Sequence, residues 1–418
     1  MKTGADRGGR GRTEAGGGAV APEALARHYS RFRVTERILL TGHSHQAWPD
    51  AGFEGQQRAW LDAAELVDDM WERAFAKAEL VRQGFARLLD DAPQHIALGV
   101  NTHEMVVRFL SALPLRSRAR LVTTDGEFQT IRRQLDRLAE EGIEVVKVAA
   151  QPAATLAERL GAAVDDRTAA LLVSAVLYAN AHIVPNLGAV LVACQRAGTE
   201  MLVDAYHALN VVPFSLREQG LEGAYVVGGG YKYCQLGGGN GFLRMSADCT
   251  LRPVVTGWFS EFTDLAEPPP DGSVRYGAGP ARFAGATYDP TSHYRAAAVF
   301  AFFEAQTFTP QRLRELSQHQ VGLLAAEFDR LDADPKVITR DRSVPVSGLG
   351  GFLALRTPLA ARLCSKLKEQ GVWTDYRGDV LRLGPAPYLT DGQLVLGVEG
   401  LGGAIRSLAN SRSTSDGT

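Results

Sequence analysis

Residues 169–206 read AALLVSAVLYANAHIVPNLGAVLVACQRAGTEMLVDAY, and two short apolar runs in this stretch flank an amphipathic segment. The runs AALLVSAV (169–176) and EMLVDAY (200–206) are brief and aliphatic, as buried parallel strands are. The segment NLGAVLVACQRAG (186–198) has apolar residues at helical spacing and ends in glycine, as helices often do. The stretch therefore predicts a strand, a crossover helix and a second, parallel strand.

The same alternation continues on both sides. ARLVTT (119–124), EVVKVAA (144–150) and GAYVVGGG (223–230) have the character of buried strands, and FQTIRRQLDRLAEEG (128–142) has that of a helix. Strands that alternate with helices predict an α/β fold, in which helices cover both faces of a mostly parallel sheet. Ligands of such folds bind beyond the carboxyl ends of the strands.

The chain changes character after residue 308. The segment 309–335 predicts a long helix, and GFLALRTP, a helix ending in SKLKEQG, and DVLRLGPAP follow it. This order predicts a smaller α+β unit, on which we expect residues before about Leu66 to pack. We therefore expect a large domain over 66–308 and a discontinuous small domain over 22–65 and 309–409. Gly- and Ser-rich segments predict disordered tails over 1–21 and 410–418, and Pro and Gly predict a long exposed loop over 261–280.

Composition excludes several classes of protein. Lys+Arg 45 against Asp+Glu 47 gives the 418 residues a formal charge of -2, so neither a nucleic acid nor an anionic membrane is an expected partner. No apolar run approaches the roughly 18 residues that cross a bilayer, and no secretory signal is recognised, so we expect a cytoplasmic protein. The four cysteines follow no paired spacing, which predicts neither disulfides nor a zinc site.

Lys232 is the first candidate for chemistry. It follows an apolar run in VVGGGYKYCQLGGGNGF, between two tyrosines and two glycine triplets. An amine in a partly apolar setting has a lowered pKa and can act as a nucleophile or form a Schiff base. The alternative is a surface lysine in a glycine turn. A Walker A phosphate loop is excluded because the chain contains no Gly-Lys pair.

Two further motifs carry polar residues at the ends of apolar runs. Asp204 ends a predicted strand in EMLVDAYHAL and His207 follows it, so a buried carboxylate there requires a cation or strong donor. Asn101, Thr102 and His103 stand where a helical period begins, and free N–H groups at a helix start suit a phosphate. The alternatives are an aspartate that caps a turn over a packed histidine, and an ordinary helix cap.

Together these motifs describe a site for pyridoxal 5'-phosphate, with a phosphate cradle, a carboxylate for the ring cation and a lysine for the aldehyde. The order D-A-Y-H, Y-K-Y, V-T-G-W-F and R-F-A-G-A-T resembles the class V aminotransferase family of fold-type I pyridoxal-phosphate enzymes, and within it kynureninase. The resemblance runs from about Leu39 to Leu408. It implies a large domain with a mostly parallel sheet of the seven-stranded type and a smaller α+β domain.

The resemblance also implies roles for individual residues. Lys232 forms the Schiff base and takes the substrate's α-proton, Asp204 pairs with the ring nitrogen, and Tyr231 joins them as a catalytic residue. Phe128 stacks on the ring. The other cofactor contacts that it implies are Thr102, His103, Ser174, His207, Trp258 and Thr287. Trp258 and Thr287 complete the phosphate site, either in their own chain or in that of a second subunit. A homodimer with active sites at the interface follows.

Substrate recognition is implied at Arg382, which matches the arginine that clamps the substrate carboxylate; the alternative is a strand-edge surface arginine. Ser44 and His45 in GHSHQ (42–46) are expected to line the substrate entrance, and a metal site there is disfavoured because alternate residues of an extended loop point to opposite sides. The family pattern is broken at Ile131, where kynureninases usually have aspartate, so the electrostatics around the ring are expected to differ.

The leading hypothesis is kynureninase-like hydrolysis of a γ-keto amino acid, either kynurenine or an analogue, with release of alanine. A class V aminotransferase or β-lyase acting on another amino acid is the alternative, and a binding module that has lost catalysis is a third. Cysteine desulfuration is disfavoured, because Cys364 lies in a helical pattern and Cys234 is expected to be packed. One sequence does not fix the substrate side chain.

Overall fold

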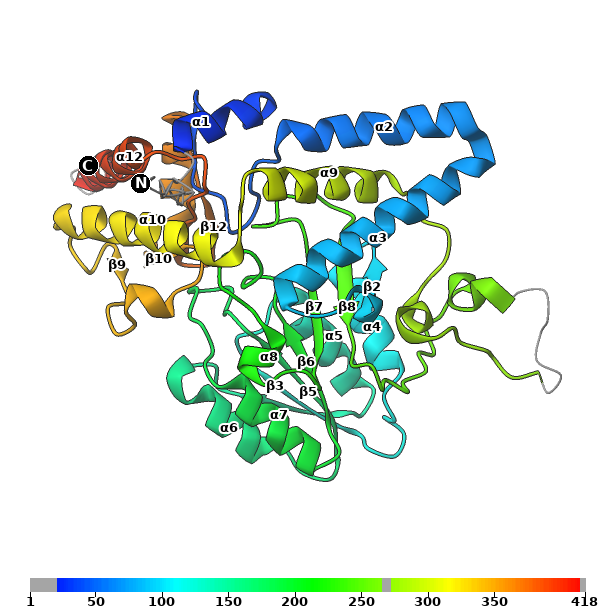
Figure 1. Cartoon of the computed structure of the whole chain (residues 1–418). Helices are drawn as coiled ribbons and strands as arrows, with labels where there is room; N and C mark the ends of the chain where they lie inside the picture. The colour runs from blue at the N-terminus through cyan, green and yellow to red at the C-terminus, as the bar shows by residue number, and fades with distance from the viewer. Residues whose placement is uncertain (1–20, 265–271, 414–418) are drawn as a thin grey trace, which may run out of the picture.

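The computed structural model describes residues 21–264 and 272–413, with side chains except at 263–264 and 409–413 (Figure 1). Its centre is a seven-stranded sheet in the order β2-β8-β7-β6-β5-β3-β4. Every neighbouring pair is parallel except the two that β8 makes, so the predicted mostly parallel sheet is confirmed. The strands are β2 (Ile96–Gly99), β3 (Arg120–Thr124), β4 (Glu144–Val148), β5 (Thr168–Ser174), β6 (Glu200–Asp204), β7 (Tyr225–Gly229) and β8 (Gly241–Arg244).

Helices cover both faces of this sheet, because successive residues of each central strand point to opposite sides. In β5, Leu171 and Val173 join the core with α6 (Leu156–Ala163) and α7 (Leu187–Arg196). Leu172 points the other way, into a second core with α4 (Thr102–Ser111) and α5 (Gln129–Glu140). The remaining helices of this part are α3 (Met70–Leu89), α8 (Leu216–Gln219) and α9 (Thr291–Ala305).

The C-terminal part forms a second, antiparallel sheet in the order β12-β13-β10-β9. Its strands are β9 (Thr339–Arg340), β10 (Leu353–Arg356), β12 (Asp375–Arg377) and β13 (Val380–Leu383), with helices α10 (Pro310–Arg330), α11 (Ala360–Glu369) and α12 (Asp391–Ser413). The N-terminal strand β1 (Ile38–Leu39) pairs in parallel with β11 (Val372–Trp373). Two segments far apart in the sequence are thereby joined, and α1 (Pro22–Ala26) and η1 (Arg27–Phe32) precede β1.

Helix α2 (Asp50–Leu66) runs alongside α9 in Figure 1 and also contacts α3, although the sequence grouped it with the smaller unit. The domain boundaries therefore stay a prediction. Short 3-10 turns stand at η2 (Val67–Asp69), η3 (Pro93–His95), η4 (Ala153–Thr155) and η7 (Val346–Gly348). The expected loop over 261–280 contains the end of η5 (Trp258–Asp264) and the start of η6 (Gly279–Phe283), and residues 265–271 lie outside the described residues. The predicted tails lie largely outside them too, but α12 extends to Ser413.

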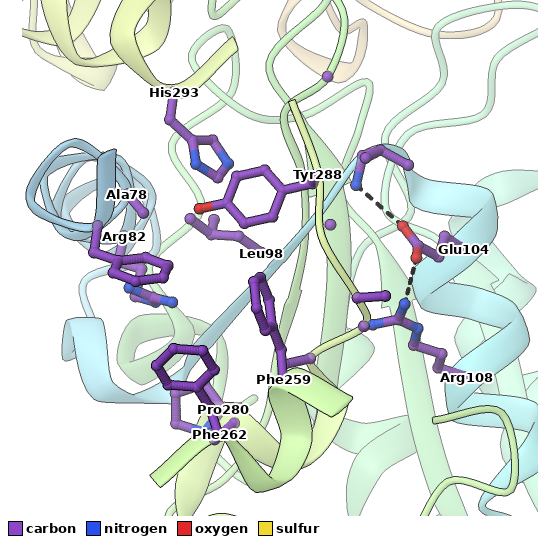
Figure 2. A pocket seen from close by; sticks show the side chains of 18 of the residues that line it. Ala78, Arg82, Leu98, Glu104, Arg108, Phe259, Phe262, Pro280, Tyr288 and His293 are labelled. Atoms are coloured by element: carbon purple, nitrogen blue, oxygen red, sulfur yellow. Dashed lines mark hydrogen bonds and ion pairs between the residues drawn. The ribbon is translucent and has the colours of Figure 1, made fainter. Parts of the chain in front are cut away.

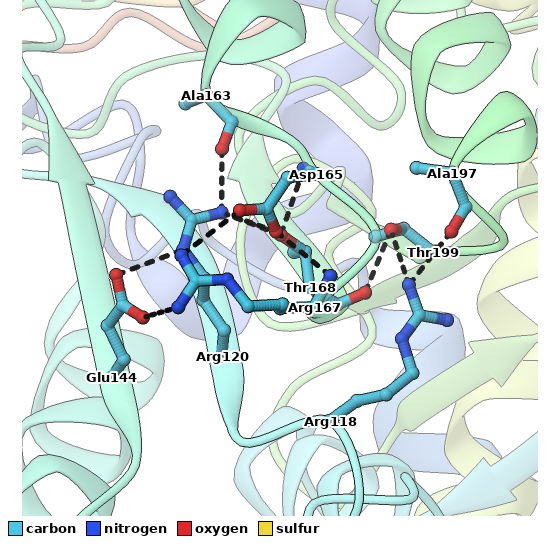
Figure 3. Close-up of polar contacts among 9 residues, drawn as sticks. All are labelled: Arg118, Arg120, Glu144, Ala163, Asp165, Arg167, Thr168, Ala197 and Thr199. Carbon is cyan, nitrogen blue, oxygen red and sulfur yellow. Dashed lines mark hydrogen bonds and ion pairs between the residues drawn. The ribbon is translucent and has the colours of Figure 1, made fainter.

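An ionic cluster joins the amino ends of three strands, as Figure 3 shows. Arg120 at the start of β3 contacts Glu144 at the start of β4, with Nε 3.0 Å from Oε1. Its Nη1 is 2.7 Å from the Thr168 hydroxyl of β5 and 3.1 Å from Asp165. The amino ends are thus tied by charged contacts, and the carboxyl ends remain for ligands. No helix in the described ranges is long and apolar enough to cross a bilayer.

Candidate active site

A cavity of about 320 Å³ lies at the carboxyl ends of the central strands. Ser174 ends β5 and Asp204 ends β6, and the two are direct register partners across the parallel pair. Lys232 follows β7 by three residues. The second sheet supplies Arg377 and Arg382. The other lining residues are His43, Ser44, Asn101, Thr102, His103, Phe128, Thr130, Val176, Tyr178, Tyr206, His207 and Tyr231.

The Lys232 amine lies inside this cavity among aromatic rings. Its Nζ is 2.6 Å from Nε2 of His207, 4.6 Å from the centre of the Tyr206 ring and 5.2 Å from that of Phe128. Burial lowers the pKa of Lys232 to about 7, against the opposing effect of the Asp204 carboxylate. The amine is therefore substantially neutral near pH 7, as a nucleophile must be.

Asp204 faces the same cavity and is buried. Its Oδ1 accepts the backbone N–H of Tyr206 at 2.8 Å, and burial raises the pKa of the carboxyl. Within residues 21–264 and 272–413 no Lys, Arg or His side chain forms an ion pair with it. A buried carboxylate without such a partner fits a cationic ring nitrogen, which supplies the missing charge.

The start of helix α4 also lines the cavity. Asn101 caps the helix, with its Oδ1 accepting the Glu104 N–H at 2.9 Å, so the capping alternative is also present. Thr102 donates its hydroxyl to the Gly228 carbonyl at 3.1 Å. A phosphate would therefore meet backbone N–H groups of the first turn rather than this hydroxyl hydrogen. A methyl group on Gly241 would stand 2.5 Å from the Asn101 carbonyl carbon, so glycine lets β8 approach the helix start.

Arg382 is buried in the cavity wall, but a carboxylate already holds it. Its Nε and Nη2 lie 2.9 and 2.5 Å from the two oxygens of Asp375, and Nη1 donates to the Tyr178 carbonyl at 2.8 Å. His43 Nε2 approaches Asp375 Oδ1 to 2.7 Å, and burial lowers the pKa of His43 to about 4. The surface-arginine alternative is therefore wrong. The contacts leave one N–H on each terminal nitrogen of Arg382 without a partner among the described residues.

The two residues that were expected at the substrate entrance, Ser44 and His45, lie in different places. Ser44 lines the cavity, whereas His45 stands behind it, with Nδ1 3.2 Å from the Tyr231 hydroxyl and its ring stacked on Trp48. His43 and His45 thus contact different neighbours. Ile131 is fully buried in the apolar core beside Leu135 and supplies no polar group.

Trp258 and Thr287 do not line this cavity. They lie on the segments η5 and 284–290, and the side chain of Trp258 is 44% exposed. The same segments border a second cavity of about 400 Å³, whose walls include Phe75, Phe259, Phe262 and Tyr288 (Figure 2). The two residues therefore do not reach the Lys232 cavity of their own chain.

None of the four cysteines lines the Lys232 cavity among the residues described. Cys234 is buried, and burial raises the pKa of its thiol to about 12. Cys364 on α11 donates to the Thr374 carbonyl at 3.4 Å. A thiolate of low pKa is what a reactive cysteine needs, so these positions do not favour desulfuration.

The sequence analysis missed several residues of the site. Glu127 is buried directly behind Ser174, and it stands three residues after β3 as Lys232 stands three residues after β7, so the same signal would have found it. Asp375, Arg377 and Tyr178 gave no local signal, because their positions depend on contacts between distant parts of the chain.

The chain is similar in sequence to an aminotransferase and to kynureninases. No family model matches the sequence. An uncharacterized aminotransferase of Bacillus subtilis is 23% identical over 77% of this chain and 82% of its own. Kynureninase of Bacillus cereus is 25% identical over 84% of this chain and 80% of its own. The resemblance to class V aminotransferases and kynureninase, predicted from the motifs, is confirmed by these matches.

Among solved structures, a mutant of the protein C-DES with glycine covalently linked to its pyridoxal-phosphate cofactor has the same fold. Its TM-score is 0.77 at 16% identity, covering 90% of this chain and 98% of that one. Another structure of C-DES describes it as a cystine C–S lyase. At this identity the likeness establishes the fold, and the predicted fold-type I architecture is confirmed.

Proposed function

We propose that this chain is a pyridoxal-phosphate enzyme acting on an α-amino acid, and that it hydrolyses a γ-keto amino acid as kynureninases do. The observation that carries the proposal is that Lys232 and Asp204 share one cavity, each buried without a countercharge in ion-pair contact. Two comparisons support this cofactor: the C-DES structure, which has the same fold, contains pyridoxal phosphate, and one of the relatives is named kynureninase.

The residues present fit this cofactor. Lys232 would hold its aldehyde carbon, Asp204 its ring nitrogen, Phe128 one ring face, and the first turn of α4 with Thr102 and His103 its phosphate. The Nδ1 atom of His207 is buried without a partner among the described residues, which leaves it for a ligand atom. When bound, pyridoxal phosphate accepts the electron pair that the substrate's α-carbon releases.

Lys232 also performs the proton chemistry in this proposal. Its neutral amine takes the α-proton of the substrate, and His207, 2.6 Å away, accepts a hydrogen bond from the resulting ammonium. Asp204 would stay ionised beside the ring nitrogen of the cofactor, and its negative charge would keep that nitrogen protonated. Tyr231 lines the cavity, and its hydroxyl, which lies 3.2 Å from Nδ1 of His45 behind it, positions a polar group of the substrate.

Arg382 binds the substrate carboxylate through its remaining N–H groups while Asp375 fixes the guanidinium plane. Arg377 lines the same wall and lies 3.4 Å from Asp375. One acidic and two basic groups leave this end of the cavity with a net positive charge, which suits a carboxylate. Ser44 beside them completes the entrance.

The reaction is tested with amino acids offered to the cofactor-loaded protein. Hydrolysis of kynurenine should release alanine and an aromatic acid, and Lys232→Ala should release neither. Release of pyruvate would instead identify a β-lyase, and transfer of nitrogen to a keto acid would identify a class V aminotransferase. The similarity to an aminotransferase and to a C–S lyase is the reason to keep these alternatives. If no amino acid changes the visible spectrum of the cofactor-loaded protein, only the hypothesis of a non-catalytic binding module remains.

The proposal includes a homodimer in the cytoplasm. Trp258 and Thr287 do not line the Lys232 cavity of their own chain, and Trp258 stands in a cluster of aromatic side chains with Phe75, Phe259 and Phe262. Phe75, Trp258 and Phe262 are each more than a third exposed, and such an aromatic surface is typical of a subunit contact. A second copy docked there would bring its Trp258 and Thr287 toward this chain's phosphate end.

A further inference from the structure

Glu127 is a buried carboxyl group one layer behind the cofactor cavity. It is 1% exposed and lies between the end of β3 and the end of β5. Its Oε1 accepts the Thr124 hydroxyl at 2.7 Å and the Ser174 N–H at 3.2 Å, and its Oε2 accepts the Ser174 hydroxyl at 2.6 Å. Every contact comes from a neutral donor, so no countercharge in contact fixes the charge of Glu127.

The hydrogen-bond pattern decides where a proton on Glu127 would sit. The Thr124 hydroxyl oxygen accepts the Gly126 N–H at 3.2 Å, so its hydrogen is directed at Oε1. Oε1 thus has two fixed donors, Thr124 and the Ser174 backbone. Oε2 has only the rotatable Ser174 hydroxyl as a partner. A proton taken up by Glu127 therefore belongs on Oε2, facing the Ser174 oxygen.

This placement couples the charge of Glu127 to the cavity. When Glu127 is ionised, the Ser174 hydroxyl gives its hydrogen to Oε2 and presents only lone pairs to the cavity that it lines. When Glu127 is protonated, Oε2–H donates to the Ser174 oxygen, and the Ser174 hydrogen turns toward the cavity. The same side chain is an acceptor in one state and a donor in the other.

We propose that Glu127 is a positioning residue whose own proton sets whether Ser174 donates or accepts a hydrogen bond at the ring oxygen of the cofactor. This inference rests on the proposed function, because the resemblance implies that Ser174 contacts the ring oxygen or the phosphate of the cofactor, and the inference takes the ring oxygen as that contact. Its consequence is a pH-dependent electronic state of the bound ring, controlled by a group that does not touch the cofactor.

The charged surroundings permit this titration near neutral pH. Burial and, to a smaller extent, the Asp204 carboxylate at the end of the neighbouring strand together raise the pKa of Glu127 to about 7, against the opposing effect of the three hydrogen bonds. Burial lowers the pKa values of three other groups that line the cavity, Lys232, His207 and His43, and raises that of Tyr206. The remaining titratable side chains of the lining are His103, Tyr178 and Tyr231. Arg377 and Arg382 stand at its far wall.

The test follows the visible absorption band of the pyridoxal-phosphate-loaded protein from about pH 5 to about pH 9. The wild-type band should contain a proton-linked component that Glu127→Gln lacks. The amide of the variant keeps both acceptor contacts and donates permanently to the Ser174 oxygen, so it should hold the low-pH spectrum at every pH. Ser174→Ala keeps the carboxyl but removes the relay, and its band should also lose that component.

The matched control is Asp125→Asn, which removes an exposed carboxylate from the same turn while keeping an oxygen for the Ala150 N–H. It should titrate as the wild type does. An unchanged midpoint in Glu127→Gln, or in Ser174→Ala if the first variant does not fold, overturns the inference. A wild-type protein without any visible band overturns the proposed function itself, so the two failures are distinct.

Discussion

The Lys232 amine owes its chemistry to burial among the Phe128 and Tyr206 rings beside His207. Because burial lowers its pKa to about 7, the neutral fraction saturates soon above neutrality. The rate at which cofactor-free protein captures pyridoxal phosphate should therefore rise with a midpoint near pH 7 and level off by about pH 8 to 9, as absorbance stopped-flow would show. Lys147→Ala, which removes an exposed lysine paired to Asp136, should capture at the wild-type rate. A rate that keeps rising to about pH 10, the range of an ordinary lysine, would contradict this.

Asp204 is expected to matter for electron withdrawal more than for binding. Asp204→Ala should retain cofactor but lower the exchange of the substrate's α-proton by about 100-fold or more, because the ring nitrogen loses its countercharge. Deuterium uptake into an amino acid, followed by NMR, measures this step whichever product is formed. Exchange at the wild-type rate would reject the role of Asp204.

The raised pKa of Glu127 also makes the stability of the cofactor-free protein depend on pH. Its pKa rises from 4.5 to about 7 on folding. The folded state binds this proton more tightly, so the contribution to stability is complete below about pH 4.5 and is lost as the pH rises through about 7. Relative to Glu127→Gln, the wild type should lose up to ~3 kcal/mol over this window in denaturant unfolding. A pH-independent difference between the two proteins would contradict the assignment.

At the scale of elements, the cofactor end depends on how closely β8 approaches the start of α4. A Cβ on Gly241 would lie 2.5 Å from the Asn101 carbonyl carbon, whereas a Cβ on Gly238 would have nothing within 4 Å. Gly241→Ala should therefore displace the helix start, at about 1–3 kcal/mol, and weaken pyridoxal phosphate binding about tenfold or more. Gly238→Ala should bind normally in the same fluorescence titration. Equal affinities in the two variants would show that this approach does not shape the site.

The elements show what the sequence could predict. The strands β3 to β7 were predictable because each contains a short run of apolar residues. Ser174 and Asp204 stand where two of these strands end, and Lys232 follows a third by three residues. Strand β8 was missed because glycines surround its short run, so neither its pattern nor its antiparallel direction could be read. The ion pair between Asp375 and Arg382 could not be predicted either, because it depends on the register in which β12 pairs with β13.

At the scale of the whole molecule, the aromatic cluster around Phe262 predicts the assembly. Phe262→Asp should yield a monomer in analytical ultracentrifugation and should bind the cofactor more weakly, because the partner's Trp258 and Thr287 would be absent. Val192 on α7 is similarly exposed, at 45% against 47%, so Val192→Asp is the matched control and should stay dimeric. A wild-type protein that is monomeric while it binds cofactor tightly would contradict the shared site.

The central claim, that one lysine at the end of β7 receives the cofactor, has a direct test. The protein is loaded with pyridoxal phosphate, reduced with borohydride, digested and mapped by mass spectrometry. A single modified peptide should carry the mass of the reduced adduct on Lys232, and Lys232→Ala should carry none. Adducts spread over Lys77, Lys147 and Lys366, with Lys232 unmodified, would contradict the account.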